Sequence, residues 1–464
     1  MEVSLNTSVL RSGVPLPDTD GNPVHAHGGH MLFENGYYYW FGENRTGRRL
    51  VSCYRSADLA EWEWRSDVLT LDSPVKPTYH RTSLELEPDR IGAVIERPKV
   101  LYNAVTGKYV MWMHWENGRD YSAARCAVAD CDTVDGDYVF RGSFNPAGNM
   151  SRDCTLFQDD DGTAYFVSAA RENADLILYR LSPDYLSIEE QVRTLWPGQA
   201  REAPAIMKRE GVYFLISSAC TGWLPNQGAY AWADQLTGRW SPLKPLGDIT
   251  TYDSQPAFIL PVTGKERGQT SYLYVGDRWD PTDYHASSYV FLPLSFPSGR
   301  EMKLEWCDAI TVDASAGEIA ALCGPTSGRF RLKSVGTELY VAAGEGTAAG
   351  VGIGKLAYGD TGQLWSVEHG PDGTASIKAG DKILGMNSSG SLKLDYPMND
   401  ETAYLWRFTE IEDSLIISCG EDLVLTAVKE AGERNGRLCL EPRRSHDPRL
   451  GRDRQLFQLI PVRP

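Results

Sequence analysis

The 464-residue sequence predicts an all-β protein of two domains. Long amphipathic helical patterns are absent, and dense turn signals separate short stretches that alternate as strands do. A strand–turn–strand unit recurs five times in the first 310 residues, and a different, threefold repeat begins near residue 325. The chain is too long for one core, so we expect domains at residues 1–316 and 325–464, with a linker near 317–328.

The repeated unit of the first domain is a strand, a Gly or Asp turn and a second strand that begins at a tyrosine. The copies are "HGGHMLFENGYYYWFGE", "ERPKVLYNAVTGKYVMWMHWE", "DCTLFQDDDGTAYFVSAARE", "EAPAIMKREGVYFLISSA" and "QPAFILPVTGKERGQTSYLYVGD". Several copies continue into an outer hairpin, as in "ILYRLSPDYLSIEE". A four-stranded unit repeated at intervals of about 50 residues is typical of a β-propeller, so five units predict five blades.

The opening residue of each inner strand is the candidate functional position. In a propeller these strands line the central channel, and their first residues face the funnel where ligands bind. In chain order they are His27, Glu96, Asp153, Glu202 and Gln255. Converging carboxylates raise one another's pKa, an arrangement that a purely structural protein has no reason to keep. The repeat therefore predicts a chemically active funnel.

Composition excludes several classes of partner and cofactor. The net charge of −16 argues against nucleic acid and anionic membranes, and no apolar run approaches the length of a membrane helix. Nine cysteines without a CxxC pair predict reduced thiols. The run 159–162, "DDDG", lacks the spacing of a calcium loop and predicts a hairpin turn, so no cofactor is required and structural calcium is not indicated. The start "MEV" resembles no signal peptide, which predicts a cytoplasmic protein if the chain is complete and a secreted one if it was trimmed.

Residues 15–310 resemble glycoside hydrolase family 43, the five-bladed inverting glycosidases. The strings "RDCTLFQDDDGTAYFVSA" and "REAPAIMKREGVYFLISS" carry the resemblance. It implies that Glu202 is the general acid and that Asp153 orients this acid and tunes its pKa.

The first blade lacks the aspartate that serves most of this family as general base. Its string "HAHGGHMLF" instead resembles the branch that contains exo-β-1,3-galactanases, and "IERPKVLYN" and "DSQPAFIL" match the same branch. The resemblance implies that Glu96 and Gln255 reach the sugar. Gln255 would position water or act as its imidic-acid tautomer, and Glu43 is the carboxylate alternative as base. The glycines after His27 would let the backbone approach the sugar, and His27 would bond a hydroxyl.

Loops that return to the funnel supply further candidates for substrate binding. They contain Tyr121 in "RDYSAARC", Thr221 and Trp223 in "SACTGWLPN", and Asp277 and Trp279 in "GDRWD". The resemblance implies that Tyr121 and Thr221 contact sugar. Trp223 and Trp279 are candidates for stacking on a sugar ring, with core packing as the alternative.

The second domain contains three similar segments, "GQLWSVEH", "AYLWRFTE" and "RQLFQLIP". They are marked by Trp365, Trp406 and Phe457, which lie 41 and 51 residues apart. Threefold repetition over about 140 residues suits a β-trefoil, and the endings resemble the Gln-x-Trp signature of ricin-type carbohydrate-binding modules. The first copy matches fully, whereas the second has Tyr404 in place of the glutamine and the third has phenylalanine in place of the tryptophan. A carbohydrate-binding module and a plain trefoil core both remain open.

Together these observations predict an inverting glycosidase that acts on an oligosaccharide or polysaccharide, with no nucleic acid, membrane or metal involved. The leading hypothesis is an exo-acting enzyme that releases galactose from β-1,3-linked galactan. The alternatives are an α-L-arabinofuranosidase or β-xylosidase of the same family, and a carbohydrate-binding propeller without activity.

Overall fold

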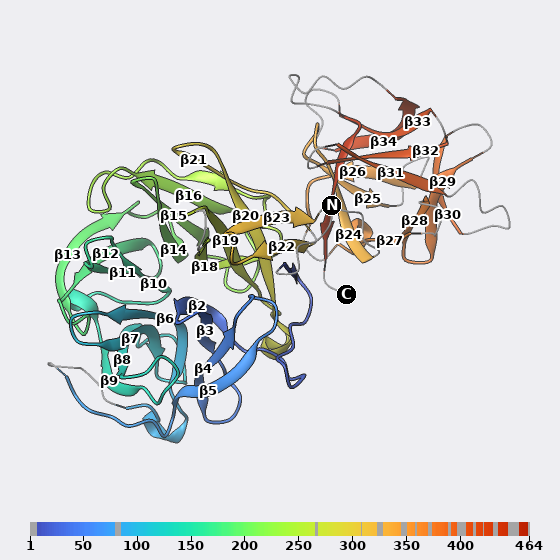
Figure 1. Ribbon diagram of the computed structural model, residues 1–464. Helices are drawn as coiled ribbons and strands as arrows, with labels where there is room; N and C mark the ends of the chain where they lie inside the picture. Colours follow the sequence, from blue (N-terminus) through green and yellow to red (C-terminus); the bar gives the residue numbers. More distant parts are fainter. Residues whose placement is uncertain are drawn as a thin grey trace. The chain divides into compact units, whose positions relative to one another are not determined.

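The structure, a computed structural model, contains two compact units, Met1–Ala321 and Leu322–Pro464 (Figure 1). It describes residues 7–78, 85–264, 268–307 and 309–322 of the first part of the chain. In the second part it describes residues 328–344, 350–357, 360–369, 374–387, 391–396, 405–411, 414–420, 422–429, 435–443 and 454–462. The observed division lies between the predicted boundaries at 316 and 325.

Strands dominate both units. The described helices are short 3-10 turns, none long and apolar enough to cross a membrane: η1 (Pro88–Arg90), η2 (Pro146–Gly148), η3 (Tyr284–Ala286) and η4 (Thr361–Gln363). The prediction of an all-β protein is therefore confirmed.

Five antiparallel sheets of four strands follow one another along the first unit. Sheet 1 contains β2 (His27–Glu34), β3 (Tyr37–Glu43), β4 (Arg49–Ser56) and β5 (Glu63–Thr70). Sheet 2 contains β6 (Val94–Asn103), β7 (Lys108–Glu116), β8 (Arg125–Cys131) and β9 (Val139–Phe144). Sheet 3 contains β10 (Cys154–Gln158), β11 (Ala164–Ala170), β12 (Asp175–Leu181) and β13 (Ile188–Leu195). Sheet 4 contains β14 (Arg201–Arg209), β15 (Val212–Ala219), β16 (Gly228–Ala233) and β17 (Lys244–Leu246), and sheet 5 contains β18 (Gln255–Thr263), β19 (Thr270–Arg278), β20 (Ser288–Ser298) and β21 (Glu301–Leu304).

The first strands of these sheets form a closed ring. Each of β2, β6, β10, β14 and β18 contacts the next, and β18 contacts β2. The sheets surround this ring in a β-propeller arrangement, in chain order from blue to yellow in Figure 1. Buried side chains fill the space between neighbouring sheets; Trp112 of sheet 2 and Phe166 of sheet 3, for example, have ring centroids 4.8 Å apart.

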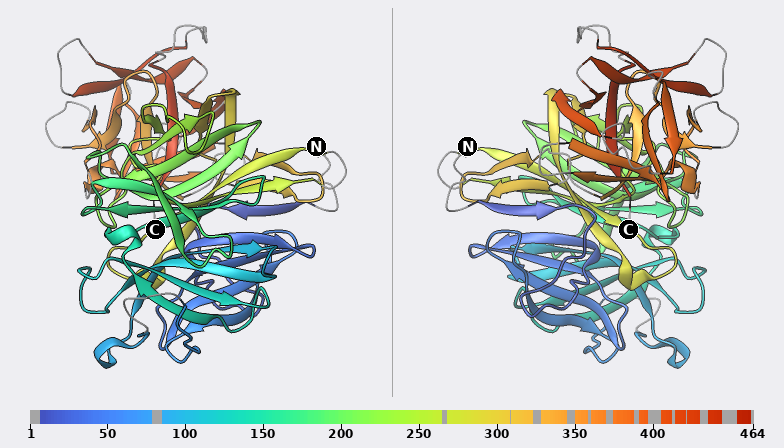
Figure 2. Two further views of the ribbon diagram at one scale, coloured as in Figure 1. Left: turned by 90° about the vertical axis from the view of Figure 1, so that its left-hand side faces the viewer. Right: turned by 90° about the vertical axis from the view of Figure 1, so that its right-hand side faces the viewer.

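The prediction of five sheets is wrong, because the first unit has a sixth. This sheet has three strands, β1 (Ser8–Arg11), β22 (Ala309–Asp313) and β23 (Glu318–Leu322). Its register pairs Leu10 with Ile310, and Figure 2 shows the blue N-terminal strand beside the yellow-orange strands. A search for repeated neighbouring strands cannot detect a pair whose members are about 300 residues apart in the sequence.

Four of the five inner strands have a β-bulge at their first residues. Register shifts occur between His27 and His30, Glu96 and Lys99, Glu202 and Ala205, and Pro256 and Phe258. At three bulges the second residue has a positive φ: 60° at Gly28, 54° at Arg97 and 49° at Ala203. Bulges of this kind re-aim side chains, and here they occur where the strands open into the funnel.

The second unit consists of one twelve-stranded antiparallel sheet system. Its strands are β24 (Gly328–Ser334), β25 (Tyr340–Ala343), β26 (Val351–Gly354), β27 (Trp365–His369), β28 (Thr374–Ala379), β29 (Lys382–Met386), β30 (Leu392–Asp395), β31 (Trp406–Ile411), β32 (Ser414–Cys419), β33 (Leu423–Val428), β34 (Gly436–Pro442) and β35 (Leu456–Pro461).

The three repeat markers of the second unit all belong to its core. Trp365, Trp406 and Phe457 are fully buried. Gln363 is also buried, and its amide bonds the backbone at Lys355 and Ala357 rather than facing solvent. Tyr404 lies outside the described residues. The Gln-x-Trp pattern thus marks packing positions of the unit.

Candidate active site

A cavity of about 330 Å³ lies in the first unit at the mouths of the inner strands. Four carboxylates, four basic side chains and two tryptophans are among the residues that line it: Glu43, Arg45, Glu96, Arg97, His114, Tyr121, Arg152, Asp153, Asn173, Glu202, Gly222, Trp223, Gln255 and Trp279. The four candidate residues placed in the chemistry by sequence, Glu96, Asp153, Glu202 and Gln255, are therefore brought together from four different sheets.

Glu202 lies on β14 against Asp153 and Gln255. Its Oε1 accepts a 3.0 Å hydrogen bond from Gln255 Nε2, and its Oε2 accepts one of 3.1 Å from Asn173. Asp153 accepts a 3.0 Å bond from the backbone N–H of Ala203, the residue that follows Glu202. Burial and then the charge of Asp153 raise the pKa of Glu202 to about 8. This carboxyl group is therefore protonated at neutral pH.

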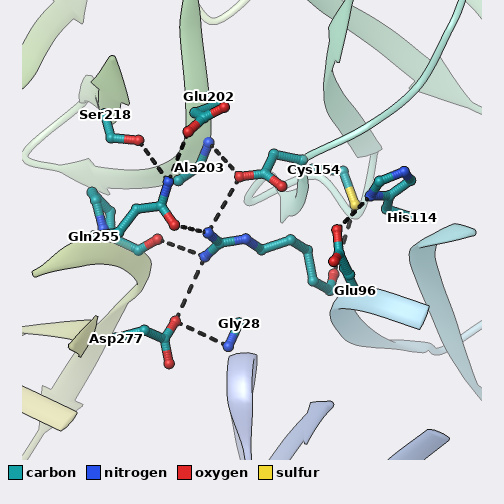
Figure 3. A network of polar contacts seen from close by, with 12 residues as sticks. Gly28, Glu96, His114, Cys154, Glu202, Ala203, Ser218, Gln255 and Asp277 are labelled. Atoms are coloured by element: carbon teal, nitrogen blue, oxygen red, sulfur yellow. Dashed lines mark hydrogen bonds and ion pairs between the residues drawn. The ribbon is translucent and has the colours of Figure 1, made fainter. Parts of the chain in front are cut away.

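The amide of Gln255 uses all its hydrogen-bonding capacity. Nε2 donates to Glu202 and, at 3.0 Å, to Ser218 Oγ (Figure 3). Oε1 accepts from Trp279 Nε1 at 2.8 Å and from the guanidinium of Arg97. Arg97 and Trp279 can only donate, so the amide atom that they face must be the oxygen. The atom that faces Glu202 and Ser218 is then the NH2 group, and these four bonds hold the amide in its ordinary tautomer.

Arg97 is a buried cation at the centre of these contacts. Besides Gln255, its guanidinium bonds Pro256 O at 2.9 Å and lies 3.2 Å from Asp153 and 3.6 Å from Asp277. The side chain is 5 % exposed. It reaches these partners from a backbone with φ of 54°, a conformation that non-glycine residues adopt at a cost of about 1–2 kcal/mol. The ion pairs offset that strain and the desolvation of the charge.

Glu96 is held in its ionised form. Its Oε1 accepts from Arg45 at 2.6 Å and from the hydroxyl of Tyr121 at 2.5 Å, and its Oε2 lies 3.0 Å from His114 Nδ1. Burial would raise its pKa, but the hydrogen bond and charge of His114, together with Arg45, hold it well below its ordinary value. Glu96 is thus an acceptor for donors, not a proton source.

His114 is held between two carboxylates. Its Nε2 lies 2.9 Å from Glu116, which also accepts from the N–H of Ala124. Burial lowers the pKa of His114, but the hydrogen bonds to Glu116 and Glu96 outweigh it and raise the pKa to about 9. The possible metal-ligand atoms of Glu96, His114 and Asp153 lie within 4.8 Å of one another, close enough to hold one metal ion. Both ring nitrogens of His114, however, already have carboxylate partners.

Glu43, the alternative base, lies at the end of β3 and lines the cavity. Arg45 bonds its Oε2 at 2.8 Å and also bonds Glu96, so one cation joins the two carboxylates. Burial raises the pKa of Glu43 to about 7, against the lowering effect of the Arg45 charge. Glu43 therefore titrates in the neutral range, where Glu202 is still protonated.

Aromatic rings form one wall of the cavity. The rings of Trp223 and Trp279 are nearly parallel, with centroids 5.9 Å apart, and Trp279 stacks in the same way on Tyr284. The guanidinium of Arg45 lies 4.5 Å from the centroid of the Tyr284 ring. Trp223 and Trp279 both line the cavity, so they are available to a sugar and also pack against each other.

Three residues predicted to bind substrate do not line the cavity. His27 is fully buried, stacks on Tyr289 at 4.7 Å and contacts Asp277 through Nδ1 at 3.2 Å. Asp277 is 1 % exposed, accepts a hydrogen bond from Gly28 N–H and forms a 3.6 Å ion pair with Arg97. The Thr221 hydroxyl donates to Leu224 O and so closes its own loop. The buried positions of His27 and Asp277 suit support of the site. Thr221 is exposed and precedes the cavity residue Gly222, so its contact with sugar stays a prediction.

The two glycines after His27 also have a different role from the predicted approach of backbone to sugar. Gly28 has φ of 60°, and a Cβ there would lie 2.7 Å from Glu43 Oε1. A Cβ on Gly29 would lie 2.0 Å from Phe41 O. Both positions exclude a side chain because protein atoms occupy the space. The buried ammonium of Lys99 bonds the carbonyl of Gly28 and holds this bulge in place.

Besides Gly222, five residues with polar or charged side chains line the cavity and were not predicted from the sequence. They are Arg45, Arg97, His114, Arg152 and Asn173. Two of them directly adjoin a predicted residue in the quoted strings, Arg97 after Glu96 and Arg152 before Asp153, so strand-opening pairs were a usable signal. The others lie on second strands or loops, whose approach to the funnel depends on tertiary structure.

A propeller whose funnel is lined by several carboxyl groups suits a glycoside hydrolase, and comparisons with known proteins agree with this class. The model of the glycosyl hydrolases family 43 matches residues 27–259, just over half of the chain. The chain therefore belongs to this family, and it is an enzyme that hydrolyses glycosidic bonds.

Solved structures of family members cover one or both units. An exo-β-1,3-galactanase from Clostridium thermocellum is 39% identical and covers 98% of this chain and 100% of its own, with a TM-score of 0.66. A β-1,3-galactosidase with galactodeoxynojirimycin is 34% identical and covers 64% of this chain and 99% of its own, with a TM-score of 0.57. An exo-β-1,3-galactanase from Phanerochaete chrysosporium, a Glu-to-Gln variant with β-1,3-galactotriose, is 28% identical, covers 98% and 92% respectively, and has a TM-score of 0.62.

A curated protein of Xylanibacter ruminicola, provisionally named a beta-xylosidase, is 28% identical over 123 residues. The match covers 24% of this chain and 24% of that relative, so the chain aligns with about a quarter of its length.

We expect Arg97→Met to lower the free energy of unfolding of the first unit by about 3–5 kcal/mol, because it leaves Asp277 and Asp153 buried without their cation. Arg97→Lys, the control, keeps the charge and should cost less. Urea unfolding followed by tryptophan fluorescence measures this change, since 11 of the 13 tryptophans precede residue 322. A loss below about 1 kcal/mol for the Met variant would show that the ion pairs contribute little.

Proposed function

We propose that the chain is an inverting, exo-acting glycosidase that releases galactose from β-1,3-linked galactan. The observation that carries the proposal is Glu202, a buried and protonated carboxyl group that faces a cavity together with Asp153 and Gln255. The substrate is suggested by relatives that are 39% and 34% identical and are named for β-1,3-galactan and β-1,3-galactoside cleavage. A cavity of about 330 Å³ is at the small end of ligand pockets, which suits a chain end better than a long internal segment.

In this proposal Glu202 is the general acid. As the bond between C1 and the glycosidic oxygen breaks, its electron pair stays on that oxygen, which takes the proton of Glu202. The oxygen of a water molecule forms the new bond to C1 from the opposite face. The proton that it gives up passes to solvent, or to Glu43 where that carboxylate is the base, so one galactose and one shortened chain result, and Glu202 regains its proton from solvent. Asp153 assists by keeping Glu202 protonated until the transfer.

We place Gln255 as the group that positions the attacking water, with Glu43 as the alternative base. In the observed arrangement both lone pairs of Gln255 Oε1 are engaged by Arg97 and Trp279. Gln255 Oε1 can therefore accept a hydrogen bond from the attacking water only when one of these donors withdraws. Glu43 has the pKa of an effective base at neutral pH, but its Oε2 is held by Arg45.

Glu96, Tyr121 and Arg45 form a hydrogen-bonded group that we assign to binding sugar hydroxyls. Glu96 is ionised and lines the cavity with both partners. Trp223 and Trp279 complete this binding surface by offering ring faces. These roles are supported by position and charge.

For the second unit we propose a β-trefoil fold and binding of polymeric substrate. The supporting observation is the recurrence of a buried aromatic residue at three equivalent positions, Trp365, Trp406 and Phe457. Two of these rings donate their indole N–H to backbone carbonyls in the same manner, Trp365 to Val341 and Trp406 to Leu384.

The proposed function predicts release of galactose from β-1,3-galactobiose with inversion, which proton NMR detects as α-galactose before mutarotation. Glu202→Gln should lose about 10²–10⁴-fold in kcat/KM on this substrate. The rate of the wild type should fall as pH rises through about 8, because Glu202 then loses the proton it must donate. Retained configuration, or a Glu202→Gln variant within threefold of wild type, would contradict the assignment. Aryl arabinofuranosides and xylosides serve as controls and should be poor substrates.

The choice between Gln255 and Glu43 can be made from pH profiles on an activated aryl β-galactoside. With Gln255 as the water-positioning group, kcat should not fall between about pH 7 and pH 5, since an amide does not titrate. Gln255→Ala should lose about 100-fold even with this good leaving group, whereas Glu43→Gln should mainly raise KM. An acidic limb near pH 7 that disappears in Glu43→Gln, with Gln255→Ala close to wild type, would identify Glu43 as the base.

A chain that ends at residue 322 should fold and cleave β-1,3-galactobiose at a rate similar to that of the full chain, because all cavity residues belong to the first unit. On insoluble galactan it should be less active than the full chain, since the linked second unit raises the local concentration of polymer. Equal retention of both proteins on the polymer would argue against a binding role for the second unit.

A further inference from the structure

The loop between β11 and β12 carries Asn173 into the cavity. Three of its four residues, Arg171, Glu172 and Asn173, have φ of 50°, 53° and 59°. Arg171 pairs with Asp175 at 2.8 Å, and the carbonyl of Asn173 accepts from Cys220 Sγ at 3.6 Å. The loop is thus fixed at both ends, which gives the Asn173 side chain a defined position beside Glu202.

The contact between Asn173 and Glu202 is incomplete on one side. Asn173 Nδ2 donates to Glu202 Oε2 at 3.1 Å. Asn173 Oδ1 is buried and has no hydrogen-bond partner among the residues that the structure describes. A buried acceptor without a partner is costly and calls for an explanation.

The hydrogen bonds around Glu202 suit its ionised form. Both carboxyl oxygens accept from amide N–H groups, one from Gln255 and one from Asn173. A protonated Glu202 has an O–H to donate, and neither amide N–H can accept it. An amide that turns over offers its oxygen as the acceptor. Gln255 is prevented from turning by Arg97, Trp279 and Ser218. When the Asn173 amide turns over, it loses only the bond from Nδ2 to Glu202 Oε2. In exchange its Oδ1 can accept a hydrogen bond from the protonated Glu202.

We propose that Asn173 is a positioning residue whose side-chain amide reverses with the protonation of Glu202, accepting the Oε2–H through Oδ1 before proton transfer and donating through Nδ2 to the carboxylate afterwards. The inference rests on the proposed role of Glu202 as general acid. The proton passes from Glu202 Oε2 to the glycosidic oxygen as that oxygen keeps the electron pair of the broken bond to C1. Asn173 itself gains and loses no proton.

Other groups also act on Glu202 and are unchanged in the test variants. Asp153 and Arg97 face it from sheet 3 and sheet 2, and Arg201 and Cys220 adjoin it on sheet 4. Burial raises the pKa of the Cys220 thiol to about 12, so it stays uncharged. A change in the pKa of Glu202 in an Asn173 variant is therefore due to the loss of the Asn173 amide.

The test compares Asn173→Gly and Asn173→Asp on two aryl β-galactosides, one with dinitrophenol and one with phenol as leaving group. Glycine and aspartate both tolerate the positive φ at this position. We expect both variants to lose about 10–100-fold in kcat/KM on the phenyl galactoside, which is a part of the full effect of general acid catalysis. On the dinitrophenyl galactoside the loss should be less than about threefold, because this leaving group needs little protonation. Arg171→Gly, in the same turn, removes the pair with Asp175 and is the control for a loosened loop; it should change the rates with both leaving groups by the same factor.

The basic limb of the pH profile provides a second readout. Asn173→Asp keeps an acceptor but adds a charge beside the carboxylate, so its basic limb should move to higher pH and further than that of Asn173→Gly. In a Glu202→Gln background, Asn173→Gly should have no further effect on the dinitrophenyl substrate, because the two residues act as one unit.

Equal losses with both leaving groups would overturn the inference, since Asn173 would then act on sugar binding or folding. Activity of Asn173→Asp close to wild type with phenol, or an unmoved basic limb in that variant, would also overturn it. Normal activity of Glu202→Gln with phenol would instead overturn the proposed function. The two failures are therefore distinguishable.

Discussion

The buried guanidinium of Arg97 is the interaction on which the rest of the active site depends. It bonds Gln255 and the carbonyl of Pro256 on sheet 5, and it pairs with Asp153 before sheet 3 and with Asp277 on sheet 5. Each of these partners would be unfavourable in a dry interior without a cation, and the cation would be unfavourable without them. The group therefore forms as a whole, and the orientation of the Gln255 amide follows from it.

The environment drives the two funnel glutamates to opposite protonation states. Glu202 is buried beside the charge of Asp153, and its pKa rises to about 8. Glu96 is buried as well, but His114 and Arg45 hold its pKa well below the ordinary value. Neighbouring groups alone thus make Glu202 a proton donor and Glu96 a hydrogen-bond acceptor. Such a separation of the pKa values of two carboxyl groups is typical of acid–base sites in enzymes.

A repeated backbone feature places these groups. Bulges shift the register at the starts of β2, β6, β14 and β18. Glu96, Glu202 and Gln255, at three of these starts, line the cavity, whereas His27 on β2 does not. The positive φ at Arg97 and Ala203 costs free energy, and the strain lies beside Glu96 and Glu202. Strain at such positions persists because the closed ring of inner strands constrains the backbone on both sides.

The sequence by itself determined the strands, the turns and the residues that open the inner strands. These follow from local alternation and from a repeated unit; the turn at Asn35-Gly36, for example, has φ of 52° and 87°, as an Asn-Gly hairpin turn requires. Glu96, Asp153, Glu202 and Gln255 could be selected in this way because equivalent positions of a repeat share one place in the fold.

Only the tertiary structure decided the sixth sheet, whose strands β1 and β22 are about 300 residues apart in the chain. It also decided that His27 and Asp277 support the site from behind, and that Arg97, His114 and Asn173 belong to it. Exposure, hydrogen-bond partners and pKa depend on side chains that other sheets bring alongside. No local pattern encodes them, because each arises from contacts between segments that meet only when the ring of strands closes.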